Sequence, residues 1–313
     1  MQKRLPKLER SPEKLRNFQI TDRSLALISA IERYKFLPTS MLLQLASGNP
    51  AVSARHLQRL YHIGLINRFC TPRHGGSGEF IYYIDETRTL ELLVSRGFKS
   101  EALDWNIIRR NKSKAYFKLS RASDTLDASG RMLFLKHELL ITRFHALLEL
   151  ACRPQDSDWR LGAWLQGSPS WKGLTGKAKE AAVLRFRPDA FFSLQNAGAS
   201  GGKVSNHFFY EADRGTATNV ERMRQKFETY CEFFNRDGLR EYGISRVRAV
   251  VMETNTVDRA ERLCTLAADV ASGMPLFWFT CSQAVEKAVP YPQSLLGRIW
   301  MNCASTELLS LCD

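Results

Sequence analysis

The sequence predicts an α/β chain, α+β overall, in which a helical N-terminal part precedes a mixed β-sheet. Short amphipathic helical patterns and a glycine-rich turn fill the first hundred residues, whereas apolar strand runs alternate with helical patterns after residue 130. The 313 residues are 44% hydrophobic, enough for two modest domains of about 100 to 200 residues each. We expect a basic arm at 1–20, a first domain at 21–100, a connector at 101–130 and a second domain at 131–313.

The charge of the chain indicates a polyanionic partner. The net charge is +13, and residues 1–73 hold 13 Lys and Arg against 4 Asp and Glu. Such asymmetry is typical of proteins that bind polyanions. Charge alone does not separate DNA from RNA or from an anionic membrane, so the folding pattern has to decide.

Several classes of protein are excluded by what the sequence lacks. It has no run of about 18 apolar residues, and residues 1–18 lack the apolar segment of a secretion signal. We therefore expect no membrane insertion and a cytoplasmic location. The seven cysteines are spread without CxxC or Cys/His zinc spacing, which favours reduced, mostly buried thiols.

The N-terminal elements begin after a flexible stretch. Residues 1–20 are basic, contain Pro6 and Pro12 and have no sustained apolar period, which predicts a flexible arm. Thr21 is positioned to cap a first helix, whose apolar residues return at intervals of three to five. One face of this helix is therefore expected in the core.

Two further helices follow, at 40–47 and from Pro50 onward. Gly48 ends the former, and Asn49 caps the latter. The residues of the third helix predicted to face the core are Val52, Leu57, Leu60 and Tyr61. Its polar face, whose side-chain types bind phosphates and base edges in the major groove, consists of Ser53, Arg55, His56, Gln58 and Arg59.

A β-hairpin is predicted after the third helix. The glycine-rich turn at 75–78 is followed by alternating strand formers, with Arg73 and His74 near the tip. A phosphate-cradling glycine loop is the alternative, but such a loop opens a helix and carries a Lys, whereas a strand follows here. Three helices and a hairpin in this order predict a winged helix-turn-helix that binds double-stranded DNA. Winged helices also serve as protein-docking modules, and that alternative stays open.

The C-terminal part predicts a mixed sheet. A long helix is expected at 132–151, with His137 and Glu138 in its first turns. Strands and helices then alternate. We expect strands at 159–166, 182–194, 206–213, 246–255 and 276–281, and helices at 218–234 and 258–271.

Carboxylates at the ends of two of these strands indicate a metal site. Asp189 follows Pro188, while Glu211 and Asp213 stand two residues apart, which places both on one face of a strand. We expect Asp189, Glu211 and Asp213 to bind Mg²⁺ or Mn²⁺, hard cations that favour carboxylate and water ligands. Such an ion makes phosphodiester hydrolysis feasible at neutral pH.

The following helix adds a cation. Lys226 and Tyr230 are one helical turn apart and point to one side. With the carboxylates they form our expected catalytic set, to which the first helix of this domain adds Glu138. A capping or surface role for His137 and Glu138 is an equal alternative.

The segments RPDA, FFYEADRGT and KFETY resemble the replication-relaxation family, which includes mobilisation relaxases of the MobC type. The similarity extends over the winged helix and most of the chain. It implies a restriction-endonuclease-like core similar to PD-(D/E)XK nucleases, with Asp189 and Glu211 as metal ligands. It also implies origin DNA as the target and accessory transfer or replication proteins as partners, with a homodimer left open.

The chain departs from the nuclease pattern at one position, since Asp213 stands where (D/E)XK requires Lys. Lys226 occupies the helix position where RecB-like nucleases carry the Gln of QhxxY, and Phe227 and Tyr230 match the remainder. Two hypotheses follow: a metal-dependent enzyme that nicks origin DNA, or a regulator that binds DNA without cutting it.

Each site residue also has an alternative interpretation without a catalytic role. Glu211 and Asp213 could be a solvated pair or bind Arg214 and Arg222, Asp189 could start a turn, and Lys226 could be a solvated lysine. His207 is expected as a strand-edge residue. The absence of a His cluster argues against a tyrosyl-DNA intermediate and favours metal-dependent hydrolysis.

Overall fold

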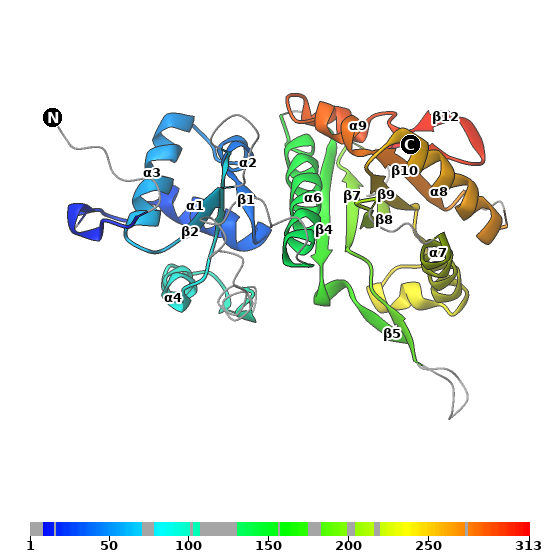
Figure 1. The fold of residues 1–313 in the computed structure, drawn as a ribbon, viewed down its shortest axis with the longest axis horizontal. Helices are drawn as coiled ribbons and strands as arrows, with labels where there is room; N and C mark the ends of the chain where they lie inside the picture. The colour runs from blue at the N-terminus through cyan, green and yellow to red at the C-terminus, as the bar shows by residue number, and fades with distance from the viewer. Residues whose placement is uncertain are drawn as a thin grey trace. The chain divides into compact units, whose positions relative to one another are not determined.

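The computed structural model forms two compact units, Met1–Ala146 and Leu147–Asp313, which are described separately (Figure 1). The residues that the structure describes are 9–15, 17–70, 78–100, 103–106, 130–155, 157–174, 183–198, 204–215, 220–272 and 275–313. The expected connector therefore lies mostly outside the described residues.

The first unit contains the three expected helices: α1 (Asp22–Tyr34), α2 (Thr39–Leu45) and α3 (Pro50–His62). The predicted caps are confirmed. Thr21 accepts a hydrogen bond from the Ser24 amide at 3.4 Å, and Asn49 accepts one from the Ala51 amide at 2.8 Å. The side-chain caps satisfy amides that a helix start leaves without partners.

A small antiparallel sheet completes the first unit. Its strands β1 (Leu37–Pro38), β3 (Phe80–Tyr83) and β2 (Asn67–Cys70) lie in that order. The β2–β3 pair is the expected hairpin, and its tip at 71–77 lies outside the described residues. α4 (Thr87–Ser95) follows. The order of helices and strands agrees with the sequence pattern, while the interpretation as a winged helix-turn-helix stays a prediction.

The helix α6 (Gly130–Ala151), predicted at 132–151, leads into the second unit. Leu135 of this helix packs with Phe36, Phe69, Ile81 and Tyr83 in an apolar cluster of the first unit. At the other end of α6, Leu147, Leu148 and Ala151 are fully buried. This burial accounts for the long apolar side that the sequence shows.

The second unit is built on a seven-stranded mixed sheet of order β12-β11-β10-β9-β8-β7-β4, which confirms the predicted α/β class. β8 (Val204–Ala212) lies inside the sheet; it pairs in parallel with β9 (Ala249–Thr254) and antiparallel with β7 (Ala190–Asn196). The other strands are β4 (Trp159–Gln166), β10 (Phe277–Cys281), β11 (Trp300–Asn302) and β12 (Ser305–Leu309).

The strand expected at 182–194 is divided in the structure. β6 (Leu184–Phe186) pairs with β5 (Lys172–Leu174) in a separate two-stranded sheet, and β7 begins only at Ala190. Pro188 lies between β6 and β7 and has no amide to donate to a ladder, which explains the break.

Two helices, α7 (Val220–Asn235) and α8 (Val257–Val270), lie on one side of the large sheet (Figure 1). The core beneath them joins rings of the sheet and of α7, among them Phe209, Phe227 and Phe279, all fully buried. Full burial of one such ring stabilises the fold by about 1.5–3 kcal/mol. This core fixes the register of α7 against β8.

The C-terminal residues add α9 (Ser282–Lys287), the edge strand β12 and its neighbour β11, none of which the sequence analysis predicted. Cys264 of α8 forms a disulfide with Cys303, with the two Cα atoms 5.7 Å apart. The expectation of reduced thiols is therefore wrong for this pair. The other five cysteines are free.

Candidate functional site

The pairing of β7 with β8 brings two of the predicted carboxylates together. Ala190 is opposite Tyr210 in this antiparallel register, so one further step places Asp189 opposite Glu211. The Ala212 amide donates a hydrogen bond to Asp189 Oδ2 at 2.9 Å, which orients that carboxylate. The two acids meet where β7 begins and β8 ends.

Glu211 is buried, with 1% of its surface exposed, and both of its oxygens have partners. Lys226 Nζ donates to Oε2 at 2.5 Å and Tyr230 Oη donates to Oε1 at 2.7 Å. A carboxylate at this depth requires such partners. The burial excludes the alternative of a solvated surface pair.

The pKa of Glu211 is raised to about 8. Burial is the largest cause, and the charge of Asp189 and a hydrogen bond with it raise the pKa further, whereas Lys226 lowers it. Two carboxylates in contact do not both ionise readily. The raised pKa favours the protonated form of Glu211 at neutral pH.

Both donors to Glu211 come from one side of α7. Phe227 anchors the helix in the core, and Lys226 and Tyr230 are one turn apart. Burial favours the neutral form of Lys226, but Glu211 and Asp189 outweigh it and raise the pKa of this ammonium. The Lys226 side chain remains 36% exposed, so its charge lies at the border between the acids and solvent.

The predicted third ligand, Asp213, is held elsewhere. Arg259 Nε donates to Asp213 Oδ2 at 2.5 Å, and the Thr254 hydroxyl donates to the same oxygen at 2.7 Å. Gly215, at a φ of 69° that a residue with a Cβ rarely adopts, donates its amide to Oδ1 at 3.2 Å. Burial would raise the pKa of Asp213, but these donors lower it below its usual value.

The structure thus brings Asp189, Glu211, Lys226 and Tyr230 together, while Asp213 forms a separate ion pair with Arg259. Neither acid of β8 forms the ion pair with Arg214 or Arg222 that was the alternative. Among the described residues, no group of three or more His, Cys, Asp or Glu side chains is placed to hold a metal ion. A metal in this cluster would have two protein carboxylates and water as ligands.

A second buried carboxylate lies on the neighbouring strand β9. Glu253 accepts hydrogen bonds from Tyr210 at 3.0 Å and from Ser282 at 2.7 Å. Tyr210 and Glu211 are consecutive in β8, so their side chains leave the sheet on opposite faces. Glu253 therefore belongs to the face opposite the Glu211 cluster.

Glu138, the remaining predicted catalytic residue, lies on the part of α6 that belongs to the first unit. Its side chain is half-buried. The role of Glu138 stays a prediction.

The predicted DNA-contacting side chains lie on α3 of the first unit. Arg55 and Arg59 are exposed, and the Arg59 guanidinium lies 5.6 Å from the centre of the Phe18 ring. His56 bonds the Ser24 hydroxyl at 2.9 Å. Burial and three neighbouring arginines lower the pKa of His56, so it is neutral at physiological pH. Gln58 is half-buried.

Two expectations for this region need correction. Ser53 was expected on the polar face of α3, but it is 1% exposed because it lies one turn before the fully buried Leu57. The arm at 1–20 is packed in part, since the Ser11 amide donates to His62 Nδ1 at 3.2 Å. Arg73 and His74 lie outside the described residues.

The sequence analysis missed the partners of several site residues. Thr254 and Arg259 come from β9 and α8, far along the chain from the Asp213 that they hold. The Ala212 amide, which orients Asp189, is a backbone group and carries no side-chain signal. These contacts depend on strand register and helix packing, which appear only in the folded structure.

Fold and cluster together define an α/β protein with two carboxylates in contact where an interior strand of its mixed sheet ends. A lysine of the helix α7 bonds one of these carboxylates. The chain belongs to the replication-relaxation family, whose profile matches residues 28–246. This match confirms the resemblance and includes all four clustered residues. Membership associates the chain with replication or mobilisation of plasmids and mobile elements, and with DNA.

No curated protein and no solved structure matches the chain. Among the described residues, no helix is long and apolar enough to cross a membrane.

Proposed function

We propose that this chain binds origin DNA through its first unit and cuts one DNA strand at the cluster of Asp189, Glu211 and Lys226. The observation that carries the proposal is the 2.5 Å contact between Lys226 Nζ and Glu211 Oε2. The lysine absent from position 213 is supplied by α7 instead, and it reaches the acid of β8.

The donor set suits a hard divalent cation such as Mg²⁺ or Mn²⁺. Each carboxylate oxygen has two lone pairs, so Glu211 keeps acceptor capacity beyond its bonds to Lys226 and Tyr230. One or two carboxylates with water and substrate phosphate are the usual ligands of Mg²⁺. Asp189 and Glu211 would hold the ion, which when bound would polarise a phosphodiester oxygen and lower the pKa of a water molecule.

The residues of the chain supply the remaining chemistry. Lys226, partly exposed, presents a positive charge to the phosphate, where negative charge develops during hydrolysis. Tyr230 and the Ala212 amide orient Glu211 and Asp189, respectively. Such fixed donors keep both carboxylates directed to one point.

Binding of DNA by the first unit is supported by charge and exposure. Arg55 and Arg59 project from α3 into solvent, in the unit that carries most of the basic excess. The order of helices and hairpin is that of a winged helix-turn-helix, whose third helix enters the major groove. Arg55→Ala and Arg59→Ala should each weaken binding, and removal of a side chain that binds only phosphate should flatten the salt dependence by about one unit of slope.

The test of cleavage is a nicking assay on supercoiled DNA of the replicon that encodes the chain, with Mn²⁺ or Mg²⁺. Open circles should form with the wild type, and Asp189→Asn or Glu211→Gln should slow their formation by about 100-fold or more. Glu228→Gln is the matched control, because Glu228 is an exposed residue of the same helix. Equal cutting by wild type and Glu211→Gln would contradict the proposal.

A second candidate function is DNA binding without cleavage. It is favoured by the two hydrogen bonds that already occupy Glu211 and by the lack of a three-ligand group among the described residues. This function predicts tight DNA binding and no open circles with either metal. It also predicts that Mn²⁺ does not raise the melting temperature of the wild type above the effect it has on Asp189→Asn. Metal-dependent cutting that Glu211→Gln abolishes would exclude it.

A further inference from the structure

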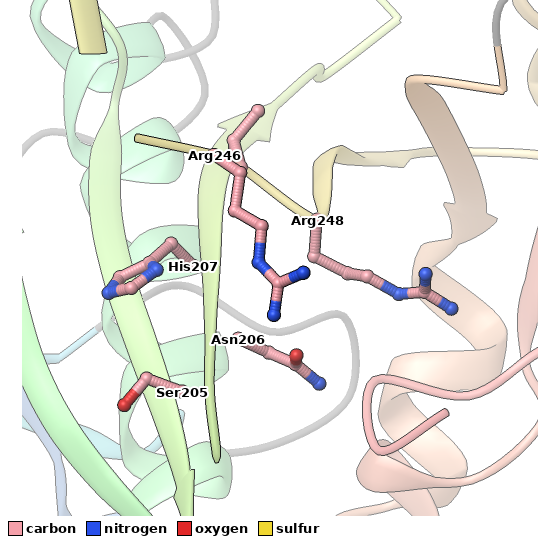
Figure 2. A pocket seen from close by; sticks show the side chains of 6 residues that line it. Ser205, Asn206, His207, Arg246 and Arg248 are labelled. Atoms are coloured by element: carbon pink, nitrogen blue, oxygen red, sulfur yellow. The ribbon is translucent and has the colours of Figure 1, made fainter. Parts of the chain in front are cut away.

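A pocket lies at the start of β8, away from the carboxylate cluster at its end (Figure 2). Its volume is about 170 Å³. The lining comes from the first residues of β8 and the loop before β9: Ser205, Asn206, His207, Arg246, Val247 and Arg248. No acidic side chain is among them.

The two arginines are exposed, and their loop is fixed to the sheet. The Arg248 amide donates to the His207 carbonyl at 2.7 Å, which extends the β8–β9 ladder by one bond. The Arg248 guanidinium lies 5.3 Å from the centre of the Trp278 ring. Within the described part of the chain, no carboxylate forms an ion pair with Arg246 or Arg248.

Neutral polar groups complete the pocket. The His207 ring stacks on Phe191, with the ring centres 6.0 Å apart. Burial, and then the charge of Arg246, lowers the pKa of His207, so the ring is neutral near pH 7 and still donates one hydrogen bond. The Asn206 side chain, on the opposite face of β8, is not a free donor, because its amide donates to the Leu311 carbonyl at 3.4 Å and to the Asp313 main-chain oxygen at 3.5 Å.

Two guanidinium groups and the neutral His207 ring, with no acidic side chain in the lining, are complementary to a phosphate group. Guanidinium forks match the geometry of phosphate oxygens and hydrate weakly, which lowers the cost of removing water. A carboxylate-lined pocket would repel the same ligand. The chemistry of the lining therefore selects an oxyanion.

We propose that this pocket binds a backbone phosphate of the DNA, as a second anchoring point besides α3. This inference rests on the proposed function, since it assumes that DNA is the ligand of the second unit. His207 and Glu211 lie four residues apart on the same face of β8, a span of about 13 Å. About four base-pair steps of duplex cover that distance, so one DNA molecule is long enough to contact both places.

The test measures DNA binding without divalent metal, by fluorescence anisotropy of a labelled 30-base-pair duplex at several salt concentrations. The double variant Arg246→Ala/Arg248→Ala should weaken binding about tenfold at low salt. Its plot of log Kd against log salt should be flatter by about one, the value for removal of one phosphate interaction. Far-UV circular dichroism verifies that the variant is folded.

The matched control is Arg236→Ala/Arg240→Ala. It removes the same charge from the same unit, but these arginines are paired with Glu232 and Asp237. Equal loss of affinity in both double variants would show that the loss depends on net charge alone. That result would overturn the pocket assignment. Unchanged affinity and slope in Arg246→Ala/Arg248→Ala would also overturn it.

A further arm separates DNA from a small phosphorylated ligand. If inorganic phosphate stabilises the wild type thermally through these arginines, while DNA affinity does not depend on them, the DNA assignment is wrong. Because binding is measured without metal, failure of cleavage would contradict the nicking proposal separately. If the chain does not cut DNA but its DNA affinity depends on Arg246 and Arg248, the proposal that the pocket binds a backbone phosphate is still supported.

Discussion

Two acids near the end of β8, Glu211 and Asp213, differ in their partners and in the direction of their pKa shifts. Glu211 touches a second carboxylate and a lysine that remains partly exposed, and its pKa is raised to about 8. Asp213, two residues further on, is enclosed by an arginine and a hydroxyl, and its pKa is lowered. Perturbation toward the neutral acid is typical of functional sites, whereas a fully paired carboxylate is typical of a structural clamp.

The largest expected difference between the two ion pairs is in catalysis. Lys226→Met should reduce the rate of nicking between a hundred- and a thousandfold, because it removes the charge beside the reacting phosphate. Arg259→Met should leave the rate within about threefold of the wild type after correction for the folded fraction. Supercoiled DNA with Mn²⁺ provides the measurement, and equal losses would abolish the distinction between cluster and clamp.

The pH dependence of stability should separate the same two acids. The unfolded chain loses the Glu211 proton near pH 4.5, whereas the folded chain keeps it to about pH 8. Stability is therefore highest below pH 4.5 with respect to this group, and it falls as the pH rises from 4.5 to 8. The contribution of Glu211 should fall by about 4 kcal/mol over this window, as measured by urea unfolding of wild type and Glu211→Gln with a chelator present.

Glu211→Gln should remove that slope and make the variant the more stable chain at pH 8. Other groups with shifted pKa values also titrate in this window, since burial lowers the pKa of His56, His145 and His207 and raises that of Glu32. The contribution of Glu211 is therefore the difference in stability between wild type and variant at each pH. A difference between the two chains that stays constant from pH 4.5 to 8 would contradict the raised pKa of Glu211.

Asp213 should matter for stability alone. Asp213→Ala removes the carboxylate that Arg259 bonds, in a site where the side chains of Asp213 and Arg259 are 10% and 15% exposed, respectively. Loss of one partner of a largely buried pair should reduce the free energy of unfolding by about 2 kcal/mol. Glu232→Ala, in the exposed pair with Arg236, should reduce the free energy of unfolding by about 0.5 kcal/mol or less. A similar reduction in Asp213→Ala and Glu232→Ala would show that the ion pair of Asp213 with Arg259 does not stabilise the fold more than an exposed pair does.

The sequence predicted the elements of both units well because they follow local rules. Caps at Thr21 and Asn49 and the apolar period of α6 require no knowledge of the rest of the fold. The strand expected at 182–194 was wrong because Pro188 divides it between two sheets. The strands β11 and β12 were missed because their short runs carry little periodic signal.

The candidate site was predictable only to the extent that its residues occur in short motifs. Asp189, Glu211, Lys226 and Tyr230 could be named from the sequence, and their contacts agree with the expected convergence. Alternation in a strand placed Asp213 with Glu211, but it could not reveal that Arg259 lies within reach. Ion pairs between distant elements depend on tertiary packing, which the sequence pattern does not encode locally.

The smallest expected effect compares the two faces of the sheet. Tyr230→Phe and Tyr210→Phe each remove one hydroxyl that bonds a buried glutamate, Glu211 and Glu253 respectively. Each should reduce the free energy of unfolding by about 1 kcal/mol, because one carboxylate oxygen loses a donor. Only Tyr230→Phe should slow nicking, by several-fold at saturating DNA, since Tyr230 orients the acid beside Lys226 while Tyr210 bonds on the opposite face. Equal nicking rates for the two variants would mean that the orientation of Glu211 does not limit the reaction.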